Sequence, residues 1–212
     1  MGISAPGVTE RSTRLDTGSL DPPLHIDWLE AAELELGKAG RLGLTFLPGK
    51  RGASFRYPGR VYRRDLAADL KTLHDGRVRH LFLLVEDEEL RRWGDPEIVP
   101  RAAELGVLVD RRPLRDGAAP RSMQEMDEIL GAVEAARADG DVAVACMGGV
   151  GRTGTIAACV LVAAGADATQ AIGRVRAVRH PTAVETAEQV AFVHAYERHV
   201  AEWRDRAARV AP

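Results

Sequence analysis

Cys146 and Arg152 stand six positions apart and frame the part of the chain best suited to chemistry. The residues between them are mostly glycine, and Thr153 follows the arginine. An apolar run typical of a strand ends at the cysteine, and helix-forming residues occupy 155–161. Backbone N–H groups at such a junction converge on anions, and the helix dipole adds positive potential. The pattern therefore places a thiol at the mouth of a predicted anion-binding loop.

The residue types around this loop predict attack on a phosphate ester. A cysteine beside a helix N-terminus and an arginine has a pKa well below the free value of about 8.5, so Cys146 is expected to be a thiolate nucleophile. Arg152 carries a planar guanidinium that can bind two phosphate oxygens at once. Thr153 can donate its hydroxyl to the sulfur when the sulfur leaves. The other phosphate oxygens are expected to meet the backbone N–H groups of Met147, Gly148, Gly149, Val150, Gly151 and Arg152.

The reaction also needs an acid that protonates the leaving oxygen. The segment 112–120 follows a strand-like apolar run and contains proline and glycine, as loops do. Asp116 in this segment is the expected general acid, although an aspartate before Gly117 is also a common turn former. Asp110 is closer to the strand and is expected to be structural.

Two other glycine-loop motifs compete for the same residues. The segment 149–154 matches the G-x-G-x-x-G dinucleotide fingerprint, with Asp167 as the candidate ribose-binding acid. That motif lies late in the chain, no clear strand presents Asp167, and the fingerprint explains neither Cys146 nor Arg152. A Walker A loop is excluded because the segment has no Gly-Lys-Ser/Thr sequence.

Strand-like and helix-like segments alternate along the rest of the chain. Apolar runs predict strands at 42–47, 81–85, 107–109 and 142–145, and helical spacing predicts helices at 64–74, from 95, from 123, at 168–178 and at 186–207. Such alternation predicts an α/β fold in which helices flank a central, mostly parallel sheet. The cysteine loop then follows the carboxyl end of a strand, where open α/β sheets bind their ligands.

The bulk composition bounds the class of protein and its partners. The chain has 212 residues, 45% of them apolar and 28% charged, which indicates one globular domain at 23–212 behind a flexible polar tail at 1–22. A net charge of −2 gives no indication of a nucleic acid or membrane partner. No apolar run approaches the ~20 residues of a membrane span, and no signal-peptide pattern opens the chain. We therefore expect a cytoplasmic protein, whose second cysteine, Cys159, packs in the core.

With Asp116 upstream of the Cys146-x5-Arg152-Thr153 pattern, the chain resembles the protein-tyrosine and dual-specificity phosphatase superfamily. The order of the two residues separates it from low-molecular-weight tyrosine phosphatases, in which the cysteine comes before the acid. The closer resemblance is to the cyclin-dependent-kinase-associated phosphatases, the kinase-inhibitor-3 family. It covers about residues 25–200 and rests on the stretches 26–29, 42–49, 113–120, 146–152 and 183–186 together with Gln189.

The resemblance implies a dual-specificity phosphatase-like fold, a phosphocysteine intermediate and no metal or other cofactor. It assigns Cys146 as nucleophile, Asp116 as general acid and Arg152 as phosphate clamp. Gln189 falls where some relatives have a glutamine that orients the attacking water. The chain departs from the family at Ala145, where a histidine normally helps to fix the loop and ionise the thiol. We therefore expect a higher pKa for Cys146 than in relatives that have the histidine.

The sequence predicts an enzyme, a phosphoric monoester hydrolase that acts on phosphotyrosine or phosphoserine/threonine in phosphoprotein substrates. A phosphoinositide or small phosphate ester is an alternative substrate, but loop positions 147–150 carry no charge that would favour a polyanion. A catalytically weak phosphate-binding module is a third interpretation and is supported only by Ala145. The acids at 86–89 are interpreted as a helix start, and the arginines at 174–179 as a solvated helix face. A weaker hypothesis is that Arg179 helps to attract an anionic substrate.

Overall fold

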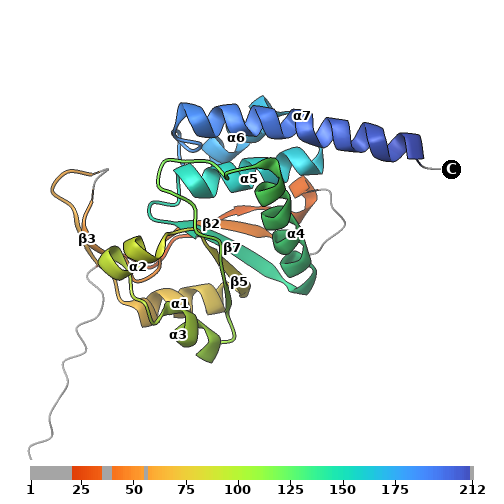
Figure 1. Ribbon diagram of the computed structural model, residues 1–212. Helices are drawn as coiled ribbons and strands as arrows, with labels where there is room; N and C mark the ends of the chain where they lie inside the picture. Colours follow the sequence, from red (N-terminus) through yellow and green to blue (C-terminus); the bar gives the residue numbers. More distant parts are fainter. Residues whose placement is uncertain (1–20, 35–39, 55–56, 211–212) are drawn as a thin grey trace, which may run out of the picture.

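The computed structural model describes residues 21–34, 40–54 and 57–210 (Figure 1). The predicted tail at 1–22 therefore lies outside the described residues, apart from its last two positions. A five-stranded sheet in the order β1-β2-β7-β5-β6 forms the centre. Its strands are β1 (Asp27–Leu29), β2 (Leu42–Phe46), β5 (Val78–Leu83), β6 (Leu108–Arg111) and β7 (Asp141–Cys146). β1 runs antiparallel to β2 and every other pairing is parallel, which confirms the expected mostly parallel sheet.

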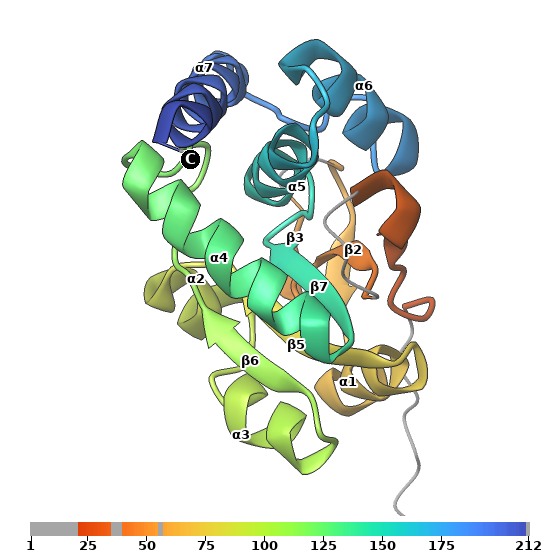
Figure 2. The same cartoon turned by 90° about the vertical axis from the view of Figure 1, so that its right-hand side faces the viewer.

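Helices cover both faces of this sheet (Figures 1 and 2). One face carries α4, α5, α6 and α7, and the opposite face carries α1 and α3, with α2 beside them (Figures 1 and 2). The helices are α1 (Leu66–Asp75), α2 (Asp87–Trp93), α3 (Ile98–Glu104), α4 (Met123–Asp139), α5 (Gly151–Ala164), α6 (Ala168–Val178) and α7 (Ala187–Val210), with a short 3-10 helix, η1 (Ala31–Leu34). The flanked sheet is the predicted α/β architecture.

Side chains of β7 alternate between two hydrophobic cores. Val142, Val144 and Cys146 contribute to the core shared with α4–α7, while Ala143 and Ala145 contribute to the core shared with α1–α3. This alternation follows from the period of two along a strand. It means that Cys146 and its neighbour Ala145 face opposite sides of the sheet.

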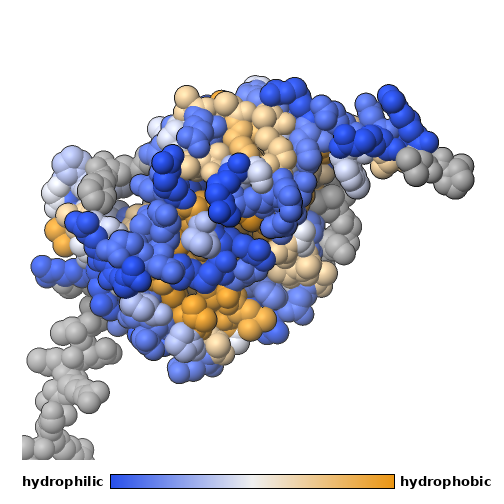
Figure 3. Space-filling model, in the orientation of Figure 1, coloured by the Kyte–Doolittle hydropathy of each residue, from blue (hydrophilic) through white to orange (hydrophobic). Residues whose placement is uncertain are grey.

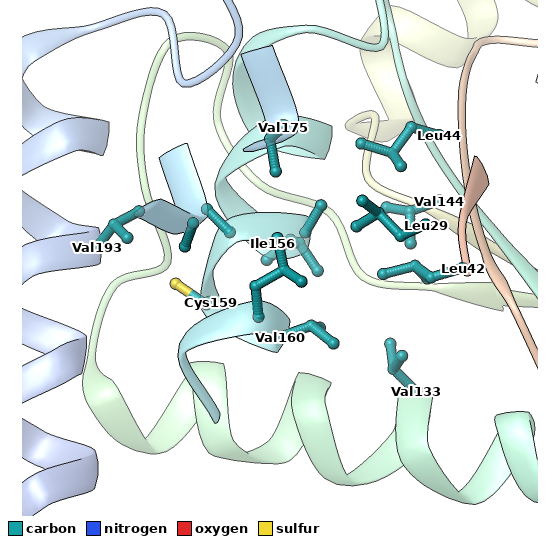
Figure 4. Packing of buried hydrophobic residues seen from close by; sticks show 14 of the residues in the cluster. Leu29, Leu42, Leu44, Val133, Val144, Ile156, Cys159, Val160, Val175 and Val193 are labelled. Carbon is teal, nitrogen blue, oxygen red and sulfur yellow. The ribbon is translucent and has the colours of Figure 1, made fainter. Parts of the chain in front are cut away.

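Helix α5 is buried along almost its whole length, from Gly151 to Val162. Figure 4 shows its Ile156 and Val160 among side chains of the sheet and the flanking helices, and its Cys159 near Val193 of α7. A helix that is apolar all round belongs in a core. Burial raises the pKa of the Cys159 thiol far above its usual value, which agrees with the predicted packing role.

Side-chain caps set the start of two helices. Ser122 caps α4, because its hydroxyl accepts a hydrogen bond from the Glu125 N–H at 3.1 Å. Asp167 caps α6 in the same way, accepting from the Gln170 N–H at 2.8 Å. Asp167 is therefore a capping residue, and the dinucleotide alternative loses its ribose-binding acid.

A two-stranded hairpin, β3 (Arg51–Ala53) with β4 (Val61–Arg63), was not predicted. Its strands are three residues long and lack a clear apolar alternation. In the part of the chain that the structure describes, no helix is both long and apolar enough to cross a bilayer. Polar side chains predominate on the face drawn in Figure 3, and apolar ones gather in smaller patches.

Candidate active site

The cysteine loop joins the end of β7 to the start of α5, in the middle of the sheet. Cys146 is the last residue of β7 and only 3% exposed. Gly149 adopts a φ of +66°, and a Cβ atom there would overlap the carbonyl oxygen of Thr45 on β2. Only glycine fits this position, because it tolerates both the left-handed backbone and the close approach.

The surroundings of Cys146 favour its ionised form. Burial by itself raises the pKa of the thiol, but the charge of Arg152 and hydrogen bonds from the Thr153 hydroxyl and the N–H groups of Thr153 and Val150 outweigh it. The net pKa lies below the usual thiol range. Among the described residues the buried Thr153 hydroxyl has no nitrogen or oxygen partner, which leaves it available to the sulfur. The loop thus shifts the pKa of the thiol in the direction that a thiolate nucleophile needs.

Arg152 is almost completely buried and is held by a carboxylate that the sequence did not indicate. Glu89 of α2 binds it with two hydrogen bonds, from Nη1 at 2.6 Å and from Nη2 at 2.7 Å. Nη1 also donates to the Leu114 carbonyl at 2.9 Å. Burial alone would lower the pKa of Arg152, but Glu89, the thiolate and Asp116 raise it above its usual value, so the guanidinium stays charged.

Glu89 has a second task at the start of α2. Its Oε2 accepts the N–H of Glu86 at 2.8 Å, which closes a capping box. The interpretation of residues 86–89 as a mere helix start was therefore incomplete. A local motif identifies the cap, but no local signal links Glu89 to an arginine 63 positions away.

Asp116 lies at the rim of the same cavity, opposite the loop. Its Oδ1 is 2.9 Å from Nη2 of Arg152, and its side chain is 78% exposed. The structure thus brings Cys146, Arg152 and Asp116 together around one cavity of about 550 Å³. Asp110 instead binds Arg112 at 2.9 Å and does not line this cavity, in agreement with its predicted structural role.

Gln189 is fully buried behind the loop and does not line the cavity. Its Oε1 accepts the Glu185 N–H at 2.8 Å, and its Nε2 donates to the Ala118 carbonyl at 3.1 Å. A Cβ atom on Gly151 would lie 3.1 Å from both amide atoms. Gln189 therefore connects α7 to the segment that carries Asp116, and its predicted role in orienting water stays a prediction.

The β3–β4 hairpin forms one wall of the cavity. Tyr62 on β4 is covered by two cations, with Lys50 Nζ 4.2 Å and the Arg60 guanidinium carbon 4.8 Å from its ring centroid. Sequence reasoning missed this wall because nothing local connects the hairpin with the cysteine loop. Within the described ranges, no group of three or more His, Cys, Asp or Glu side chains is placed to hold a metal ion.

Arg179, at the end of α6, also lines the cavity and corrects the sequence interpretation. Its side chain is only 9% exposed and forms an ion pair with Asp27 of β1 at 2.6 Å. The prediction of a solvated arginine face over 174–179 is thus wrong for this residue. Arg174 is 45% exposed and pairs with Glu33, as a surface arginine would.

Comparison with known proteins places this geometry in a family. A family model described as Tc-R-P, a DSP-PTPase phosphatase of polymorphic toxin systems, matches residues 59–166. The matched span includes Asp116, Cys146 and Arg152. Human cyclin-dependent kinase inhibitor 3 is 26% identical over 191 residues, which cover 88% of this chain and 81% of the human protein. The rat protein of the same name is 24% identical over 96% of this chain and 92% of its own length.

Solved structures show the same fold. Kinase-associated phosphatase, crystallised with its catalytic-site cysteine replaced by serine, superposes with a TM-score of 0.74 and 24% identity, over 85% of this chain and 98% of that one. The active form of Tk-PTP superposes with a TM-score of 0.60 and 29% identity, over 75% of this chain and 92% of that one. The similarity extends over most of the described domain and is not confined to the cysteine loop.

Proposed function

The chain belongs to the DSP-PTPase phosphatase family, and on that premise we propose that it hydrolyses phosphotyrosine and phosphoserine or phosphothreonine in proteins, with Cys146 as nucleophile. Membership makes it a cysteine-dependent phosphoric monoester hydrolase. The observation that carries the residue assignment is the position of Cys146, a buried thiol with a lowered pKa that shares one cavity with Arg152 and Asp116.

In the proposed first step, the Cys146 thiolate attacks phosphorus while the bond from phosphorus to the ester oxygen breaks. Arg152 and the loop N–H groups bind the phosphate oxygens, whose charge grows in the transition state. Asp116 donates its proton to the leaving oxygen, and a phosphocysteine remains. Before this step the substrate phosphate takes over the guanidinium, the ion pair between Asp116 and Arg152 opens, and the released carboxylate takes up from solvent the proton that it then donates.

In the second step, water attacks the phosphocysteine and Asp116 accepts a proton from it. The sulfur leaves as a thiolate and inorganic phosphate is released. The hydroxyl of Thr153 and the N–H of Val150 stabilise the leaving sulfur by the same hydrogen bonds that lower its pKa. We propose that Gln189 assists the water only if it turns away from its contact with the Ala118 carbonyl.

A phosphoprotein is the proposed substrate because the cavity wall is rich in aromatic side chains. Phe46, Tyr57 and Tyr62 line it on the side of the hairpin and would contact the side chain that carries the phosphate. A reducing cytoplasm is the proposed location, since a catalytic thiolate must stay reduced. A phosphoinositide is the second candidate, favoured by Lys50 and Arg60 on the same wall.

The deciding experiment compares wild type with Cys146→Ser on four substrates: para-nitrophenyl phosphate, a phosphotyrosine peptide, a phosphothreonine peptide and a phosphoinositide. We expect turnover that requires Cys146, with a higher kcat/KM on a peptide than on the lipid. Turnover that is independent of Cys146 would contradict its role as nucleophile, and turnover that is absent at every pH would contradict the enzyme and leave a phosphate-binding module. A preference for the lipid would select the second candidate.

Asp116→Asn tests the acid on the same substrates. Nitrophenolate leaves without much help, whereas the oxygen of a serine or threonine needs a proton. We therefore expect a loss of about 10²–10⁴-fold on the phosphothreonine peptide, the range typical of general acid catalysis, and a smaller loss on para-nitrophenyl phosphate. Equal losses of activity on both substrates would contradict the assignment of Asp116 as the general acid.

A further inference from the structure

Arg179 binds the outer side of the cysteine loop through main-chain carbonyls. Its Nε donates to the Gly149 carbonyl oxygen at 2.8 Å, and its Nη2 lies 3.4 Å from the Gly148 carbonyl oxygen. Its Nη1 donates to Oδ2 of Asp27 at 2.6 Å. The guanidinium thus connects β1 at the edge of the sheet to the loop at its centre.

One peptide unit transmits this contact to the thiol. The Gly149 carbonyl and the Val150 N–H belong to the same peptide, and in a trans peptide the two groups point in opposite directions. The Val150 N–H is one of the donors to the Cys146 sulfur. When Arg179 holds the carbonyl outward, it also holds that N–H toward the sulfur.

The loop has little of its own that could hold this peptide. Gly148 and Gly149 are adjacent, and glycine rotates more freely than any other residue. Ala145, before the cysteine, has only a methyl group, and it faces the opposite core. A Cβ atom on Gly149 would come within 2.6 Å of the Arg179 Nη2, so the glycine also makes room for the guanidinium.

We propose that Arg179 is a positioning residue, which aims the 149–150 peptide at the nucleophile while its ion pair with Asp27 keeps the guanidinium in place. This proposal rests on the proposed function of Cys146. Arg179 acts through the loop backbone, so it need not touch the substrate. The removal of either partner should misdirect the Val150 N–H, weaken the thiolate and remove one donor from the phosphate site.

A simple charge effect is the competing explanation, and Asp27→Asn separates the two. If Arg179 acted only as a nearby positive charge, removal of the Asp27 carboxylate would leave that charge unopposed and lower the pKa of Cys146. Under the positioning proposal the same substitution frees the guanidinium and raises that pKa. The two explanations therefore predict opposite signs for one variant.

The measurement is the pH dependence of Cys146 alkylation by iodoacetamide, with kcat and KM for para-nitrophenyl phosphate alongside. We expect Arg179→Ala to raise the alkylation midpoint by about one pH unit, the equivalent of one lost hydrogen bond to a charged group. Asp27→Asn should shift the midpoint in the same direction by less. Arg179→Lys should recover part of the shift, because an ammonium can still donate to the Gly149 carbonyl.

Two control variants show whether the effect is specific to the contacts of Arg179 and Asp27. Arg174→Ala removes an exposed arginine of α6 that pairs with Glu33 and does not line the cavity, and it should match wild type. Asp141→Asn breaks a comparable ion pair, with Arg41 at 2.7 Å, at the opposite end of β7 from Cys146, and should also leave the midpoint unchanged. The histidines and carboxylates that share the cavity with the thiol, His25, His180, Asp116 and Glu185, are retained in Arg179→Ala and Asp27→Asn. The cations Lys50, Arg60, Arg64 and Arg152 on the cavity wall are retained as well.

An unchanged midpoint in Arg179→Ala, or a lowered midpoint in Asp27→Asn, would overturn the proposal. If Arg179→Ala does not fold, Arg179→Gln and Asp27→Asn carry the test. Alkylation does not depend on turnover. An inactive wild type would therefore refute the proposed function, and the alkylation midpoints would still test the positioning role of Arg179.

Discussion

At the scale of single residues, the site depends on carboxylates that hold arginines. Glu89 binds Arg152 with two hydrogen bonds and Asp27 binds Arg179 with one. Each arginine is largely removed from solvent, and a buried guanidinium without a partner is costly. The pairs therefore set the orientation of both cations, and for Arg152 this would lower the reorganisation that the proposed phosphate binding needs.

Glu89→Gln is the first test at this scale. The amide keeps the shape of the side chain but weakens the pair with Arg152, so the clamp should lose its fixed direction. A hydrogen bond to a charged group contributes about 1.5–3 kcal/mol, so kcat/KM for para-nitrophenyl phosphate should fall roughly 10–100-fold. Glu88→Gln is the matched control, since Glu88 is exposed and binds Arg91 on the same helix. Equal activity in both variants would contradict the role of Glu89.

Ala145→His restores the residue that related enzymes have before the cysteine. Ala145 is fully buried against the core of α1–α3, so an imidazole should overpack it and lower the free energy of unfolding by about 1–3 kcal/mol. Urea unfolding measures this loss, and a value within about 0.5 kcal/mol of wild type, the usual range of a neutral surface substitution, would show that the core has room.

The expectation that the histidine lowers the pKa of Cys146 is checked by alkylation of the same variant. Superimposable alkylation curves would contradict it.

At the scale of elements, the helices on the α5 side of the sheet differ in what caps their first turn. α4 and α6 begin at Ser122 and Asp167, whose side chains cap the first turn. α5 instead begins at the cysteine loop with no side-chain cap at Val150. Its first N–H groups point toward the thiol and the predicted phosphate site. The sulfur and the phosphate would therefore accept the hydrogen bonds that a capping side chain accepts in other helices.

Asp167→Ala tests how far α6 depends on its cap. The loss of an aspartate cap costs about 0.5–2 kcal/mol, so the melting temperature should fall. Arg179 lies at the other end of α6, so activity well below the melting temperature should stay at the wild-type level. Ser122→Ala provides the comparison on α4. A loss of activity in Asp167→Ala without a loss of stability would contradict this division.

Local patterns explain which parts of the fold and the site could be predicted. Cys146, Arg152 and Thr153 are close in the sequence and lie on a strand–loop–helix unit that specifies its own geometry. The four parallel strands of the sheet were recognisable because both faces are buried, which gives continuous apolar runs such as 81–85. The antiparallel edge strand β1 was not predicted. Asp116 was found from loop chemistry alone, by its place after a predicted strand.

The remaining parts depend on contacts between distant segments. Arg179 and Asp27 are 152 positions apart, and nothing in either neighbourhood marks the pair. The same is true of Glu89 with Arg152, and of Gln189 with Ala118. The hairpin strands are too short for a readable period. Tertiary packing determines these contacts and the hairpin, and a short segment of sequence does not show which distant residues will meet.

At the scale of the whole molecule, the lowered pKa of Cys146 links the candidate nucleophile to the stability of the fold. The folded pKa of Cys146 lies below its unfolded value of about 8.5, so the folded state binds fewer protons between the two values. The resulting stabilisation is fully present above about pH 8.5 and is lost as the pH falls through the folded pKa.

Cys146→Ser removes this titration and should therefore change how stability varies with pH. The difference in free energy of unfolding, wild type minus variant, is expected to rise with pH through that window and then level off. Urea unfolding of both proteins at a series of pH values measures it. Cys159 is present in both, so its own titration cancels. A difference that is independent of pH would mean that the pKa of Cys146 is the same in the folded and unfolded protein, and a difference that falls with pH would mean that folding raises it.

The burial of α5 has a consequence for the dynamics of the site. Its amides from Ile156 to Val162 are enclosed by the sheet and by three other helices, so they should exchange their hydrogens only when the whole molecule unfolds. The β3–β4 hairpin, with strands of three residues, should exchange through small local openings that cost far less. We therefore expect the half of the cavity formed by the cysteine loop to be as stable as the fold itself, while the half formed by the hairpin can open and close again within the lifetime of the native state.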